Sequence, residues 1–225
     1  MSDRKVLAAY IKSVGALSLL CLALLGLRVA ATGSTRYLFI PGNLALAWAS
    51  LLSSLILIDR LKHQRWLAWQ NLVLSALWLF LLPNAWYVLT DFLHVYATGE
   101  ISQLYDIVLI STLVLNGFIL GLTSLFLVHR QLTKKLSFTR TYWLVEAVIL
   151  VTSFGVYLGR ALRWNSWDIL ANPIGVVVNV SDRILDPLGH QRALNITGLF
   201  FVLLSVTYFG FYNLVQVLAA SKKQP

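Results

Sequence analysis

The sequence is poor in charged residues, which make up only 12% of its 225 residues, and it contains a single methionine and a single cysteine. Soluble domains average about 25% charged residues, whereas this chain is 58% hydrophobic with a mean hydropathy of +0.74. This composition excludes an ordinary soluble enzyme domain. It also excludes a disordered chain, because disordered segments lack aromatic residues and this chain has 8 Trp, 9 Tyr and 11 Phe.

Several common chemical motifs are also missing. The lone Cys21 lies inside an apolar run, so the chain forms neither a disulfide framework nor a cysteine-based metal site. No phosphate-binding loop, dinucleotide-binding glycine motif, His-Glu-x-x-His zinc motif or Gly-x-Ser-x-Gly nucleophile motif occurs. The sequence therefore indicates none of these classes of site.

What the chain does have is six long apolar segments, each close to the roughly 20 residues that cross a bilayer. Their apolarity is continuous rather than alternating, which favours helices over the strands of a membrane barrel. We therefore predict an all-α polytopic membrane helix bundle that forms a single domain over residues 1–225. The expected spans are residues 14–31, 41–58, 69–89, 107–128, 143–159 and 196–219.

The first span also resembles a signal peptide, because basic residues precede it. Its length and the position of Arg28 favour a retained helix instead.

The net charge of +9 is unevenly distributed over the loops. Twelve of the 18 Lys and Arg residues lie on the side of the two termini: Arg4, Lys5, Lys12, Arg60, Lys62, Arg65, Arg130, Lys134, Lys135, Arg140, Lys222 and Lys223. Cytoplasmic loops carry this excess in membrane proteins. We predict a bacterial inner-membrane protein with both termini in the cytoplasm. The positive charge is then a topological signal, and no nucleic-acid partner is expected.

One polar stripe follows Pro83 near the end of the third span. Asn84, Tyr87, Asp91 and His94 recur at spacings of three and four residues, so they share one face if the segment is helical. We expect Pro83 to kink or end the helix. Asp91 and His94 are suited to bind one divalent metal ion or to form a hydrogen bond with each other. The alternative is a polar stripe that faces a water-filled vestibule.

A second polar cluster covers residues 159–168 at the end of the fifth span. Arg160 and Arg163, one helical turn apart, are suited to bind a carboxylate or a phosphate. An aromatic and basic membrane anchor is the alternative, but it would not require the other polar residues of this cluster. Those residues are Asn165, Ser166 and Asp168, and Trp164 directly precedes them.

Both clusters lie at the outer face in the predicted topology, together with Asp106 at the start of the fourth span. We expect one outward-facing polar pocket for acid–base chemistry or for an anionic group. The expected catalytic residues are Asp91, His94, Asp106 and Asp168, with Asp91 and His94 also the candidate metal ligands. The expected substrate-binding residues are Asn84, Tyr87, Arg160, Arg163, Trp164, Asn165 and Ser166.

Two further patterns concern helix packing. Residues 172–188 have helical apolar spacing after Asn172 and Pro173, which predicts a short amphipathic helix on the outer surface, suited to cover the pocket. The pairs Gly117/Gly121 and Gly155/Gly159 predict close packing of the fourth helix against the fifth.

The segments 82–94, 105–106 and 159–168 resemble the signatures of domain-of-unknown-function family 1361. The resemblance extends from about the second span to the last. It implies an uncharacterised multi-pass membrane protein of bacteria or archaea, and it assigns no activity and no catalytic residue.

Three functions remain open from the sequence. An enzyme acting on an anionic lipid, a lipid-linked molecule or another envelope substrate ranks first, because acidic, imidazole and guanidinium groups converge. A non-enzymatic accessory or binding protein ranks second. A small-solute transporter ranks third, because few ionisable residues lie at mid-membrane depth.

Overall fold

The computed structural model describes residues 3–162, 172–186 and 188–221, and within these ranges every regular element is a helix. The elements are α1 (Asp3–Thr32), α2 (Ile40–Arg60), α3 (Trp69–Tyr87), the 3₁₀ helix η1 (Val88–His94), α4 (Gln103–Leu132), α5 (Phe138–Ala161), α7 (Pro173–Leu185) and α8 (Gln191–Ser221). The predicted all-α class is confirmed.

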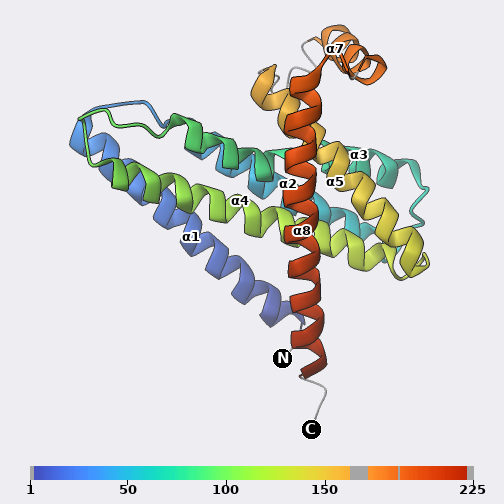
Figure 1. Ribbon diagram of the computed structural model, residues 1–225. Helices are drawn as coiled ribbons and strands as arrows, with labels where there is room; N and C mark the ends of the chain where they lie inside the picture. Colours follow the sequence, from blue (N-terminus) through green and yellow to red (C-terminus); the bar gives the residue numbers. More distant parts are fainter. Residues whose placement is uncertain (1–2, 163–171, 187, 222–225) are drawn as a thin grey trace.

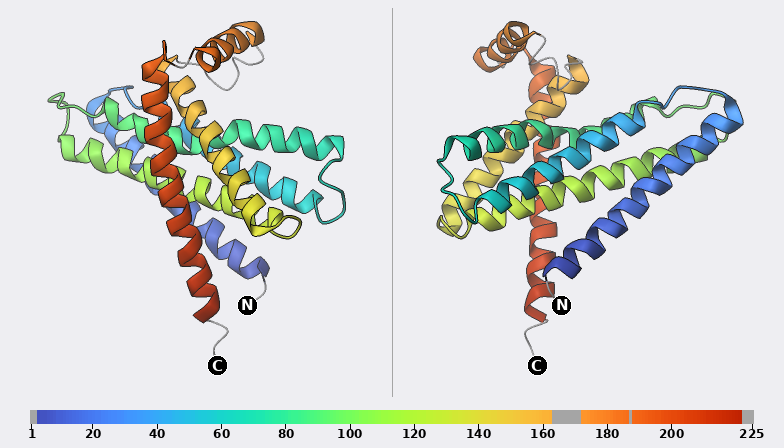
Figure 2. Two further views of the ribbon diagram at one scale, coloured as in Figure 1. Left: turned by 45° about the vertical axis from the view of Figure 1, so that its right-hand side comes forward. Right: turned by 180° about the vertical axis from the view of Figure 1, so that it is seen from behind.

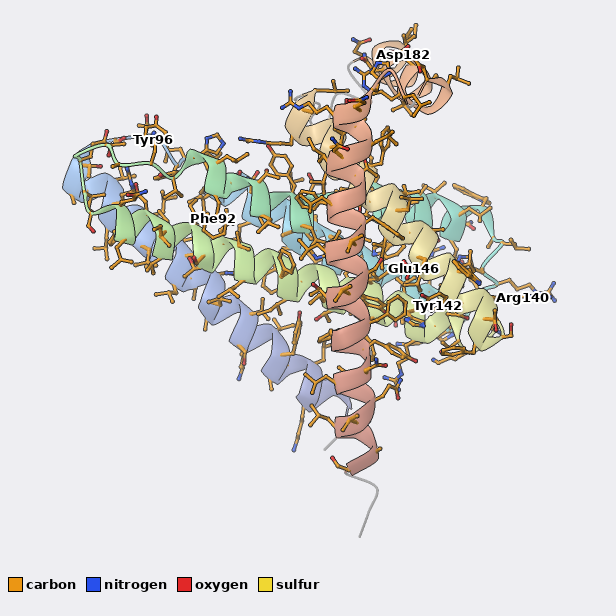
Figure 3. All side chains as sticks on the ribbon, viewed as in Figure 1. Phe92, Tyr96, Arg140, Tyr142, Glu146 and Asp182 are labelled. Atoms are coloured by element: carbon orange, nitrogen blue, oxygen red, sulfur yellow. The ribbon has the colours of Figure 1, made fainter. Side chains whose placement is uncertain are left out.

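Six helical segments are long and apolar enough to cross a membrane, which confirms the predicted number of spans. The third consists of α3 together with η1. Both chain termini lie at the same end of the bundle, and α7 lies at the opposite end (Figure 1). Figure 3 shows this arrangement with side chains, and Asp182 of α7 lies far from Arg140 at the start of α5.

The helix α3 links α2 and α4 on one side to α5 on the other. It packs against α2, α4 and α5, while α1 packs mainly on α4 and α8 mainly on α5. Figure 2 shows α1 and α8 as the two flanking helices, with α2, α3 and α4 running side by side between them. Any residue at the end of α3 is therefore positioned by three neighbours at once.

Hydrogen bonds between buried polar side chains join the flanking and central helices. Ser18 of α1 donates to Oδ1 of Asn116 at 2.8 Å and accepts from the indole of Trp48 at 3.0 Å. Ser124 of α4 donates to the Ser50 carbonyl at 2.9 Å. Because lipid offers no hydrogen-bond partners, these pairs remove polar groups from the hydrocarbon region and fix the rotation of each helix.

Of the two effects expected of Pro83, the end of the helix is wrong, because α3 remains α-helical through Pro83 to Tyr87. Two contacts accompany the continuous helix. The side-chain amide of Asn84 donates to the carbonyl of Leu81 at 3.0 Å. The proline ring packs against Gly155 of α5, where a Cβ atom would lie 2.7 Å from its Cγ. Neighbouring helices often stabilise proline in a membrane helix in this way.

The glycine pairs allow close helix packing, but their main partner is α3 rather than each other. A Cβ atom on Gly117 would overlap the backbone carbonyl of Ala85, and one on Gly121 would lie 2.7 Å from the indole nitrogen of Trp86. Gly155 meets α3 at Pro83. The fourth and fifth helices therefore contact each other only slightly, and each of them contacts α3 more extensively than it contacts the other.

The amphipathic helix predicted after Asn172 is present as α7. Asn172 is its N-cap, and the side-chain oxygen of Asn172 accepts a hydrogen bond from the backbone N–H of Gly175 at 3.0 Å. Arg183 anchors the helix to the bundle, because its Nε donates to the hydroxyl of Tyr157 in α5 at 3.0 Å.

We expect Gly117→Ala to destabilise the protein by about 1–3 kcal/mol, because the added methyl group has no space against Ala85. Gly210→Ala in α8 is the matched control, since a Cβ atom there meets nothing within 4 Å. Thermal unfolding of the detergent-purified variants measures both changes. Equal stability of the two variants would contradict the close α3–α4 contact.

Candidate functional site

A cavity of about 980 Å³ lies between α2, α3, η1 and α5. The helices α2 and α5 both pack on α3 but scarcely contact each other, so α3 forms the floor of a groove between them. Val180 of α7 also lines this space. We call it the α2–α5 groove. Its lining comprises Phe39, Gly42, Asn43, Ala45, Leu46, Ala76, Leu79, Phe80, Pro83, Asn84, Tyr87, Asp91, His94, Val151, Phe154, Gly155, Leu158, Gly159 and Val180.

The four residues of the predicted polar stripe, Asn84, Tyr87, Asp91 and His94, all line the groove. They share this side because the α-helix changes to a 3₁₀ helix at Val88. A helix with about 3.6 residues per turn followed by one with about 3.0 keeps residues at spacings of three, four and three on one face.

The carboxylate of Asp91 is the most deeply buried charged group of the groove, with 2% of the residue exposed. Its Oδ2 accepts a hydrogen bond from the side-chain amide of Asn43 in α2 at 2.8 Å. Arg160 at the end of α5 interacts with it electrostatically. A buried charge needs such partners because burial removes its hydration. Three helices therefore hold one carboxylate.

The imidazole of His94 lies beside the same arginine. Nη1 of Arg160 is 3.2 Å from Nε2 of His94. Because a guanidinium can only donate, Nε2 is the acceptor, and the ring is neutral with its proton on Nδ1. The ring of Phe39 packs against the imidazole with a centroid distance of 5.2 Å. A ligand that displaces Arg160 from Nε2 would free this nitrogen for proton transfer.

The groove is polar at one end only. In the part of α3 that precedes Pro83, the floor is formed by Ala76, Leu79 and Phe80. The α5 wall beside it is formed by Val151 and Phe154. The polar side chains come from η1, the last turn of α3 and the first turn of α2. The groove therefore has an amphipathic lining with its polar groups at the end nearest α7.

Asp106 belongs to a different cluster, which is a buried ion pair between α1 and α4. Its carboxylate accepts from Arg28 Nε at 2.7 Å and from Nη2 at 3.2 Å. Arg28 is fully buried and also pairs with Glu100 at 3.0 Å. The guanidinium stacks over the ring of Tyr37, 4.5 Å from its centroid. Asp106 does not line the groove, so the structure does not bring it together with Asp91.

Tyr37 connects this ion pair to the groove. Its hydroxyl lies 3.1 Å from Oδ2 of Asp106 and 3.1 Å from the backbone carbonyl of His94. Burial raises the pKa of the Tyr37 hydroxyl, and the negative charge of Asp106 raises it further. The hydroxyl therefore keeps its proton and remains a donor to these two acceptors.

Five of the predicted site residues, Arg163, Trp164, Asn165, Ser166 and Asp168, lie outside the described residues. Within the described part of the chain, no three His, Cys, Asp or Glu side chains gather into a group that could hold a metal ion. Asp91 and His94 remain candidate ligands, but a metal at Nε2 of His94 would have to replace its contact with Arg160.

Sequence reasoning missed three residues around the site. Asn43 follows a Pro-Gly pair and carries no signal of its contact with Asp91. Tyr37 and Arg28 contact His94 and Asp106 from segments that are distant in sequence. Arg28 did carry a signal, because a charged residue inside a membrane span is rare and almost always has a partner.

The comparisons with known proteins identify a family but no activity. The family model DUF1361, described as a protein of unknown function, matches residues 43–208, which include every lining residue of the groove except Phe39 and Gly42. No match is found among the curated proteins or the solved structures.

We expect Asp106→Ala to cost about 3–5 kcal/mol of stability, because it leaves Arg28 buried without its main partner. Asp59→Ala is the matched control. It removes an exposed carboxylate paired with Lys62, an interaction that contributes only about 0–1 kcal/mol. Chemical unfolding in detergent compares the two. An Asp106→Ala protein as stable as the control would show that this pair is not structural.

Proposed function

We propose that this chain, which belongs to the DUF1361 family, is a membrane enzyme that acts on a lipid-linked or other envelope substrate in the α2–α5 groove. One observation carries the proposal, namely that a buried carboxylate and an imidazole line the polar end of the groove, and a guanidinium lies against the imidazole. An amphipathic substrate would place its reacting group among these side chains.

The roles follow from the chemistry of each group. Asp91 is suited to accept a proton from the substrate or from water, since Asn43 orients it and burial limits its hydration. His94 is the second proton-transfer group, and Arg160 binds an anionic part of the substrate. Asn84 and Tyr87 line the approach to Asp91.

The other predicted site residues divide into two groups. Asp106 supports the site through Tyr37 rather than from within the groove. Arg163, Trp164, Asn165, Ser166 and Asp168 follow α5 directly in sequence, and we propose that they complete the binding site.

We further propose that the protein lies in a bacterial cytoplasmic membrane with both termini inside. The charge distribution over the loops supports this orientation. The polar end of the groove then faces outward, where envelope substrates occur.

A non-enzymatic accessory protein is the second candidate. Asp91 already has Asn43 as a partner and His94 already has Arg160, as expected for a structural network. A transporter has less support. The only acid in the lower part of α5, Glu146, accepts a hydrogen bond from Ser205 of α8 at 2.7 Å, outside the groove.

We expect Asp91→Asn to abolish turnover without unfolding the protein, because the substitution preserves size and removes only the charge. Membrane lipids and envelope precursors of cells producing the wild type or the variant are compared by mass spectrometry. Asp59→Asn, at an exposed position, is the control. A product seen with the wild type and Asp59→Asn but not with Asp91→Asn supports the enzyme. Identical profiles in all three favour the accessory protein.

The orientation is tested with cysteine variants, because Cys21 is fully buried and contributes little background. We expect a membrane-impermeant maleimide to label Ala97→Cys, between η1 and α4, in intact cells. Gln64→Cys, between α2 and α3, is exposed at the other end and should react only after lysis. The reverse pattern would place the groove's polar end in the cytoplasm.

A further inference from the structure

We infer that the occupant of the α2–α5 groove is a single anionic membrane lipid. Its phosphate-bearing headgroup contacts Arg160, and its hydrocarbon lies along α3 within one leaflet. The inference rests on the proposed function, which places the site in this groove. It adds the class of the bound molecule, the charge of that molecule and the route by which it enters.

The length of the groove fits one leaflet. Its floor on α3 extends from Ala76 to Tyr87, which is about 17 Å of helix at roughly 1.5 Å per residue. The hydrocarbon core of a bilayer is about 30 Å thick, so one leaflet supplies about 15 Å. A molecule with its polar group beside Asp91 and its chain along the floor would end near the bilayer midplane.

The distribution of polarity fits an amphipathic occupant. Every lining residue of α3 before Pro83 is apolar, and Val151 and Phe154 continue this surface on α5. A wholly polar solute would leave these walls without contacts, and a pure hydrocarbon would leave the polar end without hydrogen-bond partners. Only a molecule with both parts satisfies the whole groove.

The charge balance favours an anionic headgroup. Arg160 is partly buried, and its hydrogen bond is to a neutral imidazole rather than to a carboxylate. No ion pair joins it to an acid among the residues that the structure describes. Arg36 also acts electrostatically on His94. Two guanidinium groups thus act on His94, and one of them, Arg160, also acts on the carboxylate of Asp91. A poorly hydrated guanidinium binds phosphate strongly.

Lateral access follows from the packing of the walls. Because α2 and α5 scarcely contact each other, these two walls leave the groove open on the side away from α3, where Val180 of α7 borders it. Ala45 on one wall is exposed, and Val151 on the other is 51% exposed. In a membrane these positions face lipid, so a lipid can enter sideways without leaving its leaflet.

The test measures binding rather than turnover, so it can fail independently of the proposed enzyme activity. The full chain in detergent is titrated with phosphatidic acid, phosphatidylcholine or inorganic phosphate, and bound molecules are counted by native mass spectrometry. We expect one phosphatidic acid per chain, weaker binding of phosphatidylcholine, and no competition by inorganic phosphate. Equal binding of the two lipids would contradict the preference for an anionic headgroup. Competition by inorganic phosphate would contradict the contribution of the lipid's hydrocarbon chains to binding.

Two variants locate the bound lipid. Arg160→Gln should weaken phosphatidic acid binding about tenfold or more, the scale of a charge-assisted hydrogen bond, while Arg160→Lys should retain part of it. Ala45→Trp fills the groove and should abolish binding, whereas Ala23→Trp, on the exposed surface of α1, should not. Thermal unfolding confirms that each variant is folded. Undiminished binding in folded Ala45→Trp would place the lipid elsewhere and overturn the inference.

Binding as expected without any product in the Asp91 comparison would retain the lipid site and reject the enzyme. A product that depends on Asp91, without binding of phosphatidic acid, would support the enzyme and reject the lipid site. The two proposals are therefore tested separately.

Discussion

The close approach of α3 to α4 is the contact on which the other features depend. At Gly117 and Gly121 the absence of side chains lets α4 lie directly against Ala85 and Trp86, the residues immediately before η1. Van der Waals packing at such small-residue contacts is a main source of helix association in lipid, where the hydrophobic effect between helices is absent. The position of this segment determines where the polar stripe of η1 lies.

The chain holds two kinds of buried charge, and the membrane environment separates their roles. Arg28 and Asp106 form a bidentate pair that is fully enclosed between α1 and α4. Its geometry satisfies most of the polar atoms, as a structural ion pair requires. Asp91 instead lines the groove and Arg160 lies beside the groove residue His94, and each is bonded to a neutral side chain. Groups arranged in this way can exchange their present contacts for those of a ligand.

Tyr37 joins these two regions. It contacts Asp106 on one side and the backbone of His94 on the other, so the ion pair of α1 and α4 also restrains the end of η1. The arrangement explains how a histidine at the end of a short 3₁₀ helix can hold one position. It also gives Asp106 a supporting role near the groove, although its carboxylate does not reach the cavity.

The sequence by itself determined the six apolar helices, the N-cap of α7 at Asn172, and the stripe of Asn84, Tyr87, Asp91 and His94. These features follow from local rules, since hydropathy, capping and helical spacing act over a few residues. The span predicted over residues 69–89 crosses Pro83, but the contact of this proline with Gly155 of α5 could not be read from the sequence. Only the tertiary structure showed that Asp106 pairs with Arg28, that Asn43 holds Asp91, and that α2 and α5 leave a groove over α3. Each of these depends on how distant helices rotate and pack, and many side chains with no local signal decide that together.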